Sequence, residues 1–268
     1  MTILILAAGY ATRLYPLTLD KPKPLLKVGA RTIIEHIIEK ISQINGPERC
    51  FIVTNQKFFK HFQKWASNFS ALPAFGGRGG KFSVPIEVIN DETTSNETRL
   101  GAIRDIEFVI KKKAIKDNLL VIGGDNLFEF SLKEFVEFAE AHRPDVSLAV
   151  FDIKAKEKAK QYGVVKIDSS NRVINFQEKP PKPESTLIST CVYYFPKDKL
   201  NLMSHFLSSG NKADAPGNYI KWLSENDKVY AFVFEEDWYD IGDIASYEAA
   251  NKVYSRDRFR GGQRNLSP

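Results

Sequence analysis

The chain is poor in the residues that hold disulfide-rich or cysteine-ligated metal proteins together. It has only 2 cysteines in 268 residues, Cys50 and Cys191, and both lie in apolar runs typical of β-strands. A disulfide framework or a cysteine-based metal site needs more thiols at characteristic spacings. We therefore predict two buried free thiols.

Long hydrophobic runs are missing as well. No apolar segment approaches the roughly 20 residues that a membrane-spanning helix needs. The chain enters an apolar β-type run directly, without the basic segment and long apolar core of a signal peptide. We expect a cytoplasmic protein with no membrane partner.

A strong, evenly spread excess of charge is also absent. The formal net charge is +5, but residues 252–268 carry five basic side chains against one acidic side chain, so the rest of the chain is close to neutral. No nucleic-acid-binding motif accompanies this basic end. We expect no nucleic-acid partner, and we interpret residues 255–268 as a basic, solvated tail.

The most informative stretch that is present covers residues 5–24. An apolar run breaks at Gly9, Arg13 follows in the turn, and Lys23 stands between two prolines. A strand that ends in a glycine-containing turn exposes several backbone N–H groups at one point, which suits an anion. Arginine adds a bidentate fork and lysine a mobile point charge. The combination predicts a polyphosphate site.

In the first half of the chain, β-type runs alternate with segments of helical periodicity. The expected strands are Thr2–Ala8, Cys50–Thr54, Val84–Asn90 and Asn118–Ile122, and the expected helices are Thr32–Ile44, Lys57–Ala66, Glu97–Ile110 and Ser131–His142. This rhythm predicts an α/β fold with a Rossmann-like, doubly wound, mostly parallel sheet. Ligands of such sheets lie beyond the carboxyl ends of the strands.

The second half is richer in β-type runs. The expected strands are Val146–Ile153, Gly163–Ile167, Val173–Gln177, Leu187–Phe195 and Val229–Phe234, and the expected helices are Asp198–Leu207 and Asp243–Tyr254. No linker, repeat or change of composition divides the chain. We predict a single domain over residues 1–254, with a nucleotide-binding half (about 1–142) and a β-rich half for the second substrate (about 143–254).

Two aspartates follow expected strands. Asp125 comes after two glycines at the end of an apolar strand, and Asp240 follows the last expected strand. Alone, an aspartate at such a place serves as readily for helix capping as for metal binding. Magnesium at a phosphate commonly takes one or two carboxylates plus phosphate oxygens, so this pair predicts a Mg²⁺ site. We interpret Asp243 as the N-cap of the last helix.

Four motifs together resemble those of the sugar-nucleotide nucleotidyltransferases. The family pattern L-A-A-G-x-G-T-R-L-x-P-L-T, followed by P-K-P-L, is matched by residues 6–18 and 22–25, with Ala11 in place of the second glycine. The patterns G-D-N and W-x-D-x-G are matched by residues 124–126 and 238–242. An E-K-P pattern is matched by residues 178–180. The motifs appear in the family's order across most of the chain.

The resemblance implies a set of site residues. The catalytic residues would be Arg13 and Lys23, the Mg²⁺ ligands Asp125 and Asp240, and the sugar-phosphate ligands Gly163, Glu178 and Lys179. The expected nucleotide contacts are Leu6, Ala8, Gly9, Tyr10, Ala11, Thr12, Glu92, Thr98 and Gly124. The usual glutamine-containing pattern for base recognition is not evident in residues 91–101, which leaves the base open.

The implied reaction is Mg²⁺-dependent transfer of a nucleoside monophosphate from an NTP to a sugar 1-phosphate, with a homo-oligomer among the expectations. One alternative is a cytidylyltransferase acting on a non-sugar phosphomonoester such as phosphocholine or inositol phosphate. Another is a non-catalytic regulatory protein that binds a nucleotide sugar. The presence of Arg13, Lys23, Asp125 and Asp240 argues against the latter.

Overall fold

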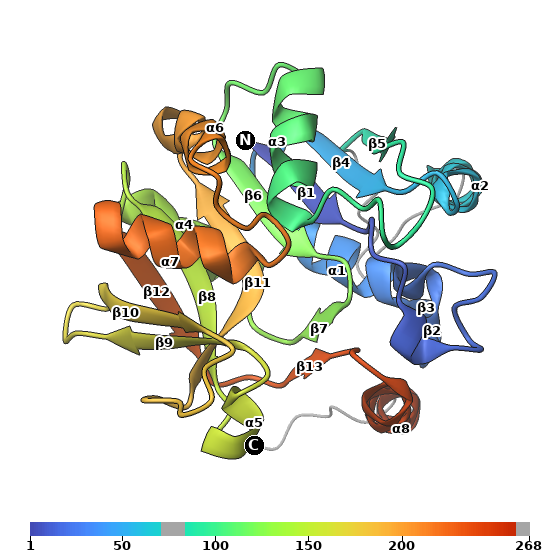
Figure 1. Ribbon diagram of the computed structural model, residues 1–268. Helices are drawn as coiled ribbons and strands as arrows, with labels where there is room; N and C mark the ends of the chain where they lie inside the picture. The colour runs from blue at the N-terminus through green and yellow to red at the C-terminus, as the bar shows by residue number, and fades with distance from the viewer. Residues whose placement is uncertain (71–83, 261–268) are drawn as a thin grey trace.

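The computed structural model describes residues 1–70 and 84–260, without the side chains of residue 70 and residues 256–260. A nine-stranded sheet runs through its centre (Figure 1). Its strands are β1 (Thr2–Leu6), β4 (Arg49–Thr54), β5 (Ile86–Asn90), β6 (Leu119–Gly123), β8 (Val146–Asp152), β9 (Gly163–Ile167), β10 (Val173–Glu178), β11 (Leu187–Phe195) and β12 (Val229–Phe234).

The sheet has a parallel part and a mixed part. Strands β6, β1, β4 and β5 are neighbours in that order and are parallel. Strand β11 lies antiparallel beside β6 and also pairs with β8 and β9, while β12 extends β8 in parallel and β10 pairs with β9. From these pairings, β10 and β11 run opposite to the other strands of this sheet. The mostly parallel sheet that the sequence predicts is therefore confirmed.

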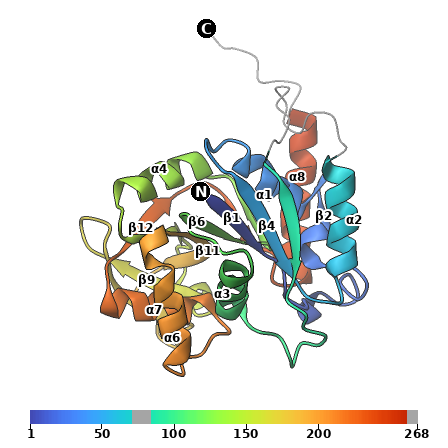
Figure 2. The ribbon, with the colours of Figure 1, turned by 90° about the horizontal axis from the view of Figure 1, so that it is seen from above.

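Helices cover both faces of the sheet because successive residues of a strand point to opposite sides. Ile3 and Ile5 of β1 face one core cluster, and Leu4 faces the other. The first cluster takes residues from α1 (Ile33–Ile41), α2 (Phe59–Ser70), α4 (Leu132–Ala141) and α8 (Ile244–Arg260). The second takes residues from α3 (Ala102–Lys112), α6 (Asn201–Ser208) and α7 (Pro216–Asn226). Figure 2 shows the two layers on opposite sides of a doubly wound sheet.

Smaller elements complete the structure. Strands β2 (Lys27–Val28) and β3 (Arg31–Thr32) form a short ribbon that α8 contacts. Strands β7 (Asn126–Phe128) and β13 (Trp238–Asp240) form a second, antiparallel ribbon. The remaining elements are α5 (Lys156–Ala159) and the 3₁₀ turns Thr12–Leu14, Lys23–Leu25 and Lys197–Lys199.

The clearest differences from the sequence prediction are in helices α3, α7 and α8. Helix α3 begins at Ala102 rather than at Glu97, because Gly101 takes a φ of 88° that an ordinary helix excludes. Helix α7 was not predicted. Helix α8 continues to Arg260, so residues 255–260 are helical and not part of a tail, whereas residues 261–268 lie outside the described residues.

The extension of α8 has a physical cause at Tyr254, the residue at which the helix was expected to end. The Tyr254 hydroxyl donates to Glu129 Oε1 at 2.6 Å, and its ring makes an edge contact with His36 at 4.9 Å between centroids. These contacts hold the helix on the molecule six residues before its last residue.

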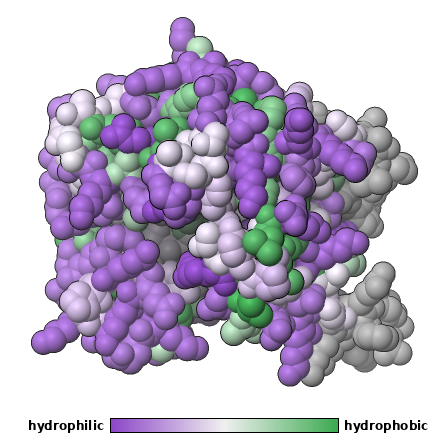
Figure 3. Space-filling view, turned by 45° about the vertical axis from the view of Figure 1, so that its right-hand side comes forward, coloured by the Kyte–Doolittle hydropathy of each residue, from purple (hydrophilic) through white to green (hydrophobic). Residues whose placement is uncertain are grey.

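The surface agrees with the composition, whereas the prediction of two buried free thiols is confirmed for Cys50 but not for Cys191, which is only partly buried. Among the described residues, no helix is both long enough and apolar enough to span a bilayer. The face in Figure 3 is mainly hydrophilic, with hydrophobic residues in small groups. Both cysteines are free; burial raises the pKa of the Cys50 thiol to about 12, and Cys191 is half-buried.

Candidate active site

The glycine turn after β1 forms one wall of a cavity of about 420 Å³. Six of the nine residues expected to contact the nucleotide line this cavity: Leu6, Gly9, Tyr10, Ala11, Thr12 and Gly124. Arg13, Lys23 and Asp125 line it too, so positive charge and a carboxylate lie at one end. The turn and both predicted cations therefore face a common space.

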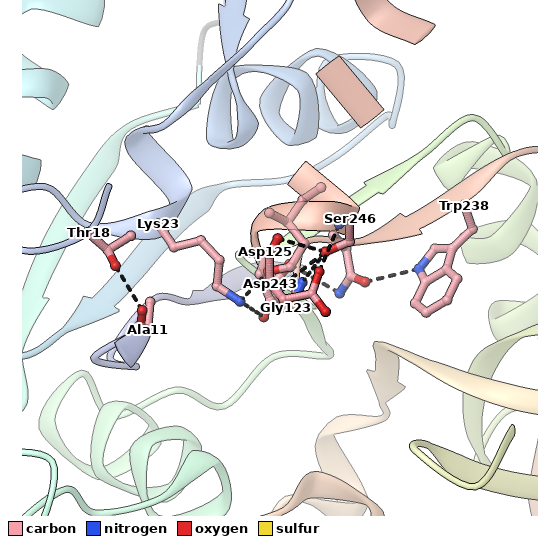
Figure 4. Close-up of polar contacts among 11 residues, drawn as sticks. Ala11, Thr18, Lys23, Gly123, Asp125, Trp238, Asp243 and Ser246 are labelled. Atoms are coloured by element: carbon pink, nitrogen blue, oxygen red, sulfur yellow. Dashed lines mark hydrogen bonds and ion pairs between the residues drawn. The ribbon is translucent and has the colours of Figure 1, made fainter. Parts of the chain in front are cut away.

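Two positions define the backbone of the turn. A Cβ built on Gly9 would meet no other atom within 4 Å, so Gly9 leaves open space beside the cavity. The left-handed position is instead Ala11, with φ 49° and ψ 39°. The buried hydroxyl of Thr18 donates to the Ala11 carbonyl at 2.8 Å (Figure 4) and helps to hold this conformation.

We expect Ala11→Gly to leave stability unchanged or to raise it by up to about 1 kcal/mol, because glycine has no Cβ penalty at positive φ. Urea unfolding measures this effect, and Ala11→Val is the control: a β-branched residue at this φ should destabilise the protein. Turnover of the glycine variant should stay within about threefold of the parent, well under 1 kcal/mol of barrier. A larger fall would mean that the methyl group itself contacts a substrate.

Lys23 links the two segments that carry the predicted metal ligands. Its Nζ donates to Asp125 Oδ2 and to the carbonyl oxygen of Ile241, both at 2.7 Å. The two prolines around it hold the backbone of a short 3₁₀ turn, and the Lys23 side chain is 13% exposed. The fold therefore holds this cation in the lining of the cavity, in contact with Asp125 (Figure 4).

Strand pairing brings Asp125 and Asp240 together from distant parts of the chain. Asn126 of β7 lies opposite Asp240 of β13, and the Ile241 N–H donates to the Asp125 carbonyl at 3.2 Å. The Trp238 indole N–H also donates to Asn126 Oδ1 at 3.0 Å (Figure 4). The pairing of this β-ribbon thus brings both carboxylates to the lining of one cavity.

The electrostatics of the two carboxylates differ. Burial, and after it the Asp125 carboxylate, raise the pKa of Asp240 to about 6 against the opposing effect of Lys23 and Arg13. Burial also acts to raise the pKa of Asp125, but Lys23 and Arg13 outweigh it and hold that pKa below its ordinary value. Two half-buried carboxylates that repel each other favour the binding of an additional positive charge beside them.

This donor set fits a hard divalent cation. Asp125 and Asp240 offer carboxylate oxygens, the ligands that Mg²⁺ takes in proteins, and both line one cavity. Among the described residues, no group of three or more histidine, cysteine or acidic side chains forms a closed metal cage. Two carboxylates are sufficient only where a substrate phosphate completes the coordination.

A second cavity, of about 280 Å³, lies on the β-rich side. All three residues predicted to bind the sugar phosphate line it: Gly163, Glu178 and Lys179. Arg13 and Asp125 line this cavity as well as the first, so the two spaces meet at these residues. Asp240 faces the second cavity only.

Gly217 of α7 shapes the second cavity and was missed in the sequence. A Cβ at Gly217 would lie 1.8 Å from Glu178 Oε2, and a Cβ at Gly163 would lie 2.4 Å from the Phe176 ring. The two glycines therefore make room for the Glu178 carboxylate and the buried ring below it. Only the Ala-Pro-Gly-Asn start of α7 marks this place in the sequence.

Three predicted nucleotide contacts lie away from the first cavity. The Ala8 carbonyl accepts from the Asn55 side chain at 2.9 Å, and the Glu92 carboxylate pairs with Lys112 at 3.3 Å. The Thr98 hydroxyl contacts the Ser95 carbonyl at 3.2 Å. None of the three lines the cavity.

Asn96 and Arg99 line the first cavity instead. Arg99 forks to both carboxylate oxygens of Asp214, at 3.0 and 2.9 Å, and its other nitrogen donates to Asn96. The sequence signals only a polar turn here, since the position of Arg99 depends on Asp214 from the other half of the chain.

The chain is similar in sequence to known nucleotidyl transferases. A family model described as "Nucleotidyl transferase" matches residues 2–257. The chain is 31% identical over 252 residues to the bifunctional protein GlmU of Methanocaldococcus jannaschii, covering 94% of this chain and 54% of that protein. It is 28% identical over 281 residues to a glucose-1-phosphate adenylyltransferase of Trichlorobacter lovleyi, covering 92% and 64%. The chain thus spans a little over half of these relatives.

The fold has solved counterparts. A crystal structure of UDP-glucose pyrophosphorylase complexed with UDP-glucose superposes with a TM-score of 0.77 at 18% identity, covering 96% of this chain and 99% of that one. At this identity the likeness supports the fold alone. Since the family model spans nearly the whole chain and its motifs converge on one site, the protein belongs to the nucleotidyl transferase family.

Proposed function

We propose that the protein transfers a nucleoside monophosphate from a nucleoside triphosphate to a sugar 1-phosphate and releases pyrophosphate. The observation that carries this proposal is the meeting of two cavities at Arg13 and Asp125. The first is bounded by the glycine turn and Lys23, and the second by Glu178 and Lys179. A group is transferred between two bound substrates only when their reacting atoms lie close together, and two adjoining binding sites provide this arrangement.

The residues at the junction suit charge stabilisation. An oxygen of the sugar phosphate, anionic at neutral pH, attacks the α-phosphorus while the bond to the pyrophosphate breaks, so no general base is required. Lys23 and Arg13 lie where negative charge on the phosphates gathers, and such transfers depend mainly on positioning and electrostatics. Mg²⁺ held by Asp125 and Asp240 would add charge neutralisation at the α-phosphate.

The two halves of the chain would divide the substrates. Residues of the first 142 positions form the first cavity, which we assign to the nucleotide. Residues after 143 supply most of the second cavity, which we assign to the sugar phosphate. Strand β13 returns across this division and brings Asp240 to the junction.

Pyrophosphate release tests the proposal. ATP, CTP, GTP, UTP and dTTP are each assayed with Mg²⁺ against a panel of sugar 1-phosphates, with phosphocholine and inositol phosphate in the same panel. Release that requires one triphosphate and one sugar 1-phosphate is the expected result. Release only with a non-sugar phosphomonoester would support the alternative acceptor class. No release from a folded protein with any pair would contradict transferase activity.

We expect Gly217→Ala to raise the KM for the sugar phosphate between about tenfold and a hundredfold, because it displaces the Glu178 carboxylate. The atom displaced is the end of a flexible side chain, so the fold should persist. The KM for the triphosphate should change little. Lys221→Ala, an exposed change on the same helix, is the matched control. Equal rises for both substrates would place Gly217 outside a separate sugar-phosphate site.

A further inference from the structure

A buried pair of acids, Asp91 and Asp105, has no part in the chemistry described above. Asp91 follows β5 and is 5% exposed; Asp105 lies in the first turn of α3 and is 6% exposed. Neither residue lines a cavity named above. Burying two carboxyl groups together is costly unless a proton or a cation compensates the charge.

Asp91 organises the turn that follows β5. Its Oδ1 accepts two hydrogen bonds from Thr93, one from the backbone N–H and one from the hydroxyl, both at 2.8 Å. Since the Thr93 hydroxyl donates to Asp91, its oxygen is left to accept. The Tyr10 hydroxyl, 3.5 Å away, is then the donor to Thr93. A directed chain of hydrogen bonds therefore runs from Tyr10 through Thr93 to Asp91.

The other side of Asp91 meets Asp105. Both side chains are buried, and Asp91 Oδ2 and Asp105 Oδ1 have no donor among the described residues. Two ionised carboxylates have no donor to share, so a proton between the two groups supplies the missing hydrogen bond. The two hydrogen bonds from Thr93 favour the ionised form of Asp91, so Asp105 is the acid that donates.

The surrounding charges favour retention of this proton. Burial, and then the Asp91 charge, raise the pKa of Asp105 to about 8. Besides burial, the negative charge of Glu92 raises the pKa of Asp91. The negative charges of Asp91 and Glu97 likewise add to the effect of burial on the pKa of Tyr10. Glu92 is itself paired with Lys112 of α3 at 3.3 Å. Tyr10 has a raised pKa, first through burial, so its hydroxyl keeps the proton that it donates.

Tyr10 connects the pair to the nucleotide. It lines the first cavity, on the glycine turn. We propose that Asp91 and Asp105 share one proton and act as positioning residues, holding Tyr10 through Thr93 and so shaping the wall of the nucleotide cavity that Tyr10 lines. The positioning role rests on the proposed function; the shared proton does not.

Stability measured against pH tests the shared proton, independently of any activity. Asp105 is protonated in the folded protein up to a pKa of about 8, but in the unfolded chain it ionises near pH 4. Between these values unfolding releases a proton, so stability falls as pH rises. Asp105→Asn keeps an N–H donor for Asp91 and cannot titrate. The equilibrium constant for unfolding is measured for the parent and for this variant at each pH. The ratio of the parent's constant to the variant's constant should rise about tenfold per pH unit from roughly pH 5 to 7.

A ratio that stays flat across this range would overturn the shared proton. Asp198→Asn, at a carboxylate in the exposed 3₁₀ turn before α6, is the matched control and should give a nearly flat ratio. If Asp105→Asn does not fold, Asp105→Ser supplies a second neutral donor at the same position, and the same slope is expected.

Nucleotide binding tests the positioning role. Titration calorimetry with Mg²⁺ and each of ATP, CTP, GTP, UTP and dTTP gives the dissociation constant for the tightest triphosphate. Thr93→Val removes the hydroxyl that links Tyr10 to Asp91 and should raise this dissociation constant about tenfold. In Thr93→Ser and Asp105→Asn the dissociation constant should stay within about threefold of the parent value. Above pH 8 the affinity of the parent for the triphosphate should fall more than that of Asp105→Asn. Unchanged affinity in Thr93→Val would overturn the role. No binding of any triphosphate to the parent would overturn it together with the proposed function.

Discussion

Asp125→Asn and Asp240→Asn should each lower kcat by about a hundredfold to a thousandfold with little change in fold. Each change removes one of the two carboxylates that the β7–β13 ribbon brings to the lining of the second cavity. An amide keeps the shape of the side chain but loses its charge, so it compensates a cation poorly. Steady-state pyrophosphate release measures kcat, and circular dichroism confirms the fold.

Asp243→Asn is the matched control for these variants. Asp243 lies three residues beyond Asp240, and its Oδ1 accepts the Ser246 N–H at 2.8 Å as the N-cap of α8 (Figure 4). Asparagine caps a helix about as well as aspartate, so turnover should stay within about threefold. Near-normal kcat in either Asp125→Asn or Asp240→Asn would reject that residue as a metal ligand.

Lys23→Met should lower kcat by at least about a hundredfold, because it removes a fixed, mostly buried cation from the site that we propose for the reacting phosphate. The Ile241 carbonyl loses its donor as well, which should cost roughly 1–3 kcal/mol of stability. Methionine keeps the length and apolar stem of lysine, so the loss reports the charge. Single-turnover rates at saturating substrates separate the chemical step from binding.

Lys21→Met tests whether any lysine of this loop would have the same effect. Lys21 precedes Lys23 by two residues and is exposed. Its removal should change kcat less than about threefold, in line with other exposed substitutions. A similar fall in both variants would mean that the loop contributes general positive charge rather than one placed cation.

Local sequence was sufficient to predict much of the structure that surrounds the first cavity. The apolar run of β1, the glycine turn and the prolines around Lys23 each act through their own backbone preferences, so the strand, the turn and the lysine were placed correctly. The positive φ falls on Ala11, at the position where the family pattern has its second glycine. Tertiary contacts, such as that of Thr18 with the Ala11 carbonyl, override the local preference.

The junction and the second cavity depended on contacts between distant segments. Asp125 and Asp240 were each identified from a short motif, but their meeting depends on the pairing of β7 with β13. Gly217 matters because Glu178 lies against it, and Arg99 because Asp214 holds it. A sequence pattern reports what a residue prefers within a few neighbours, whereas these positions depend on what the folded chain brings within a few ångströms.

The chain by itself therefore determined the alternation of strands and helices, the glycine turn and the identity of the charged groups, since these follow from periodicity and backbone preference. Only the tertiary structure decided which groups share a space. It turned Glu92 toward Lys112, brought Arg13 to the border of both cavities, and buried Asp91 against Asp105. Burial and long-range pairing change the energy of a charged group by more than its immediate sequence neighbours do, and both arise only when the chain is folded.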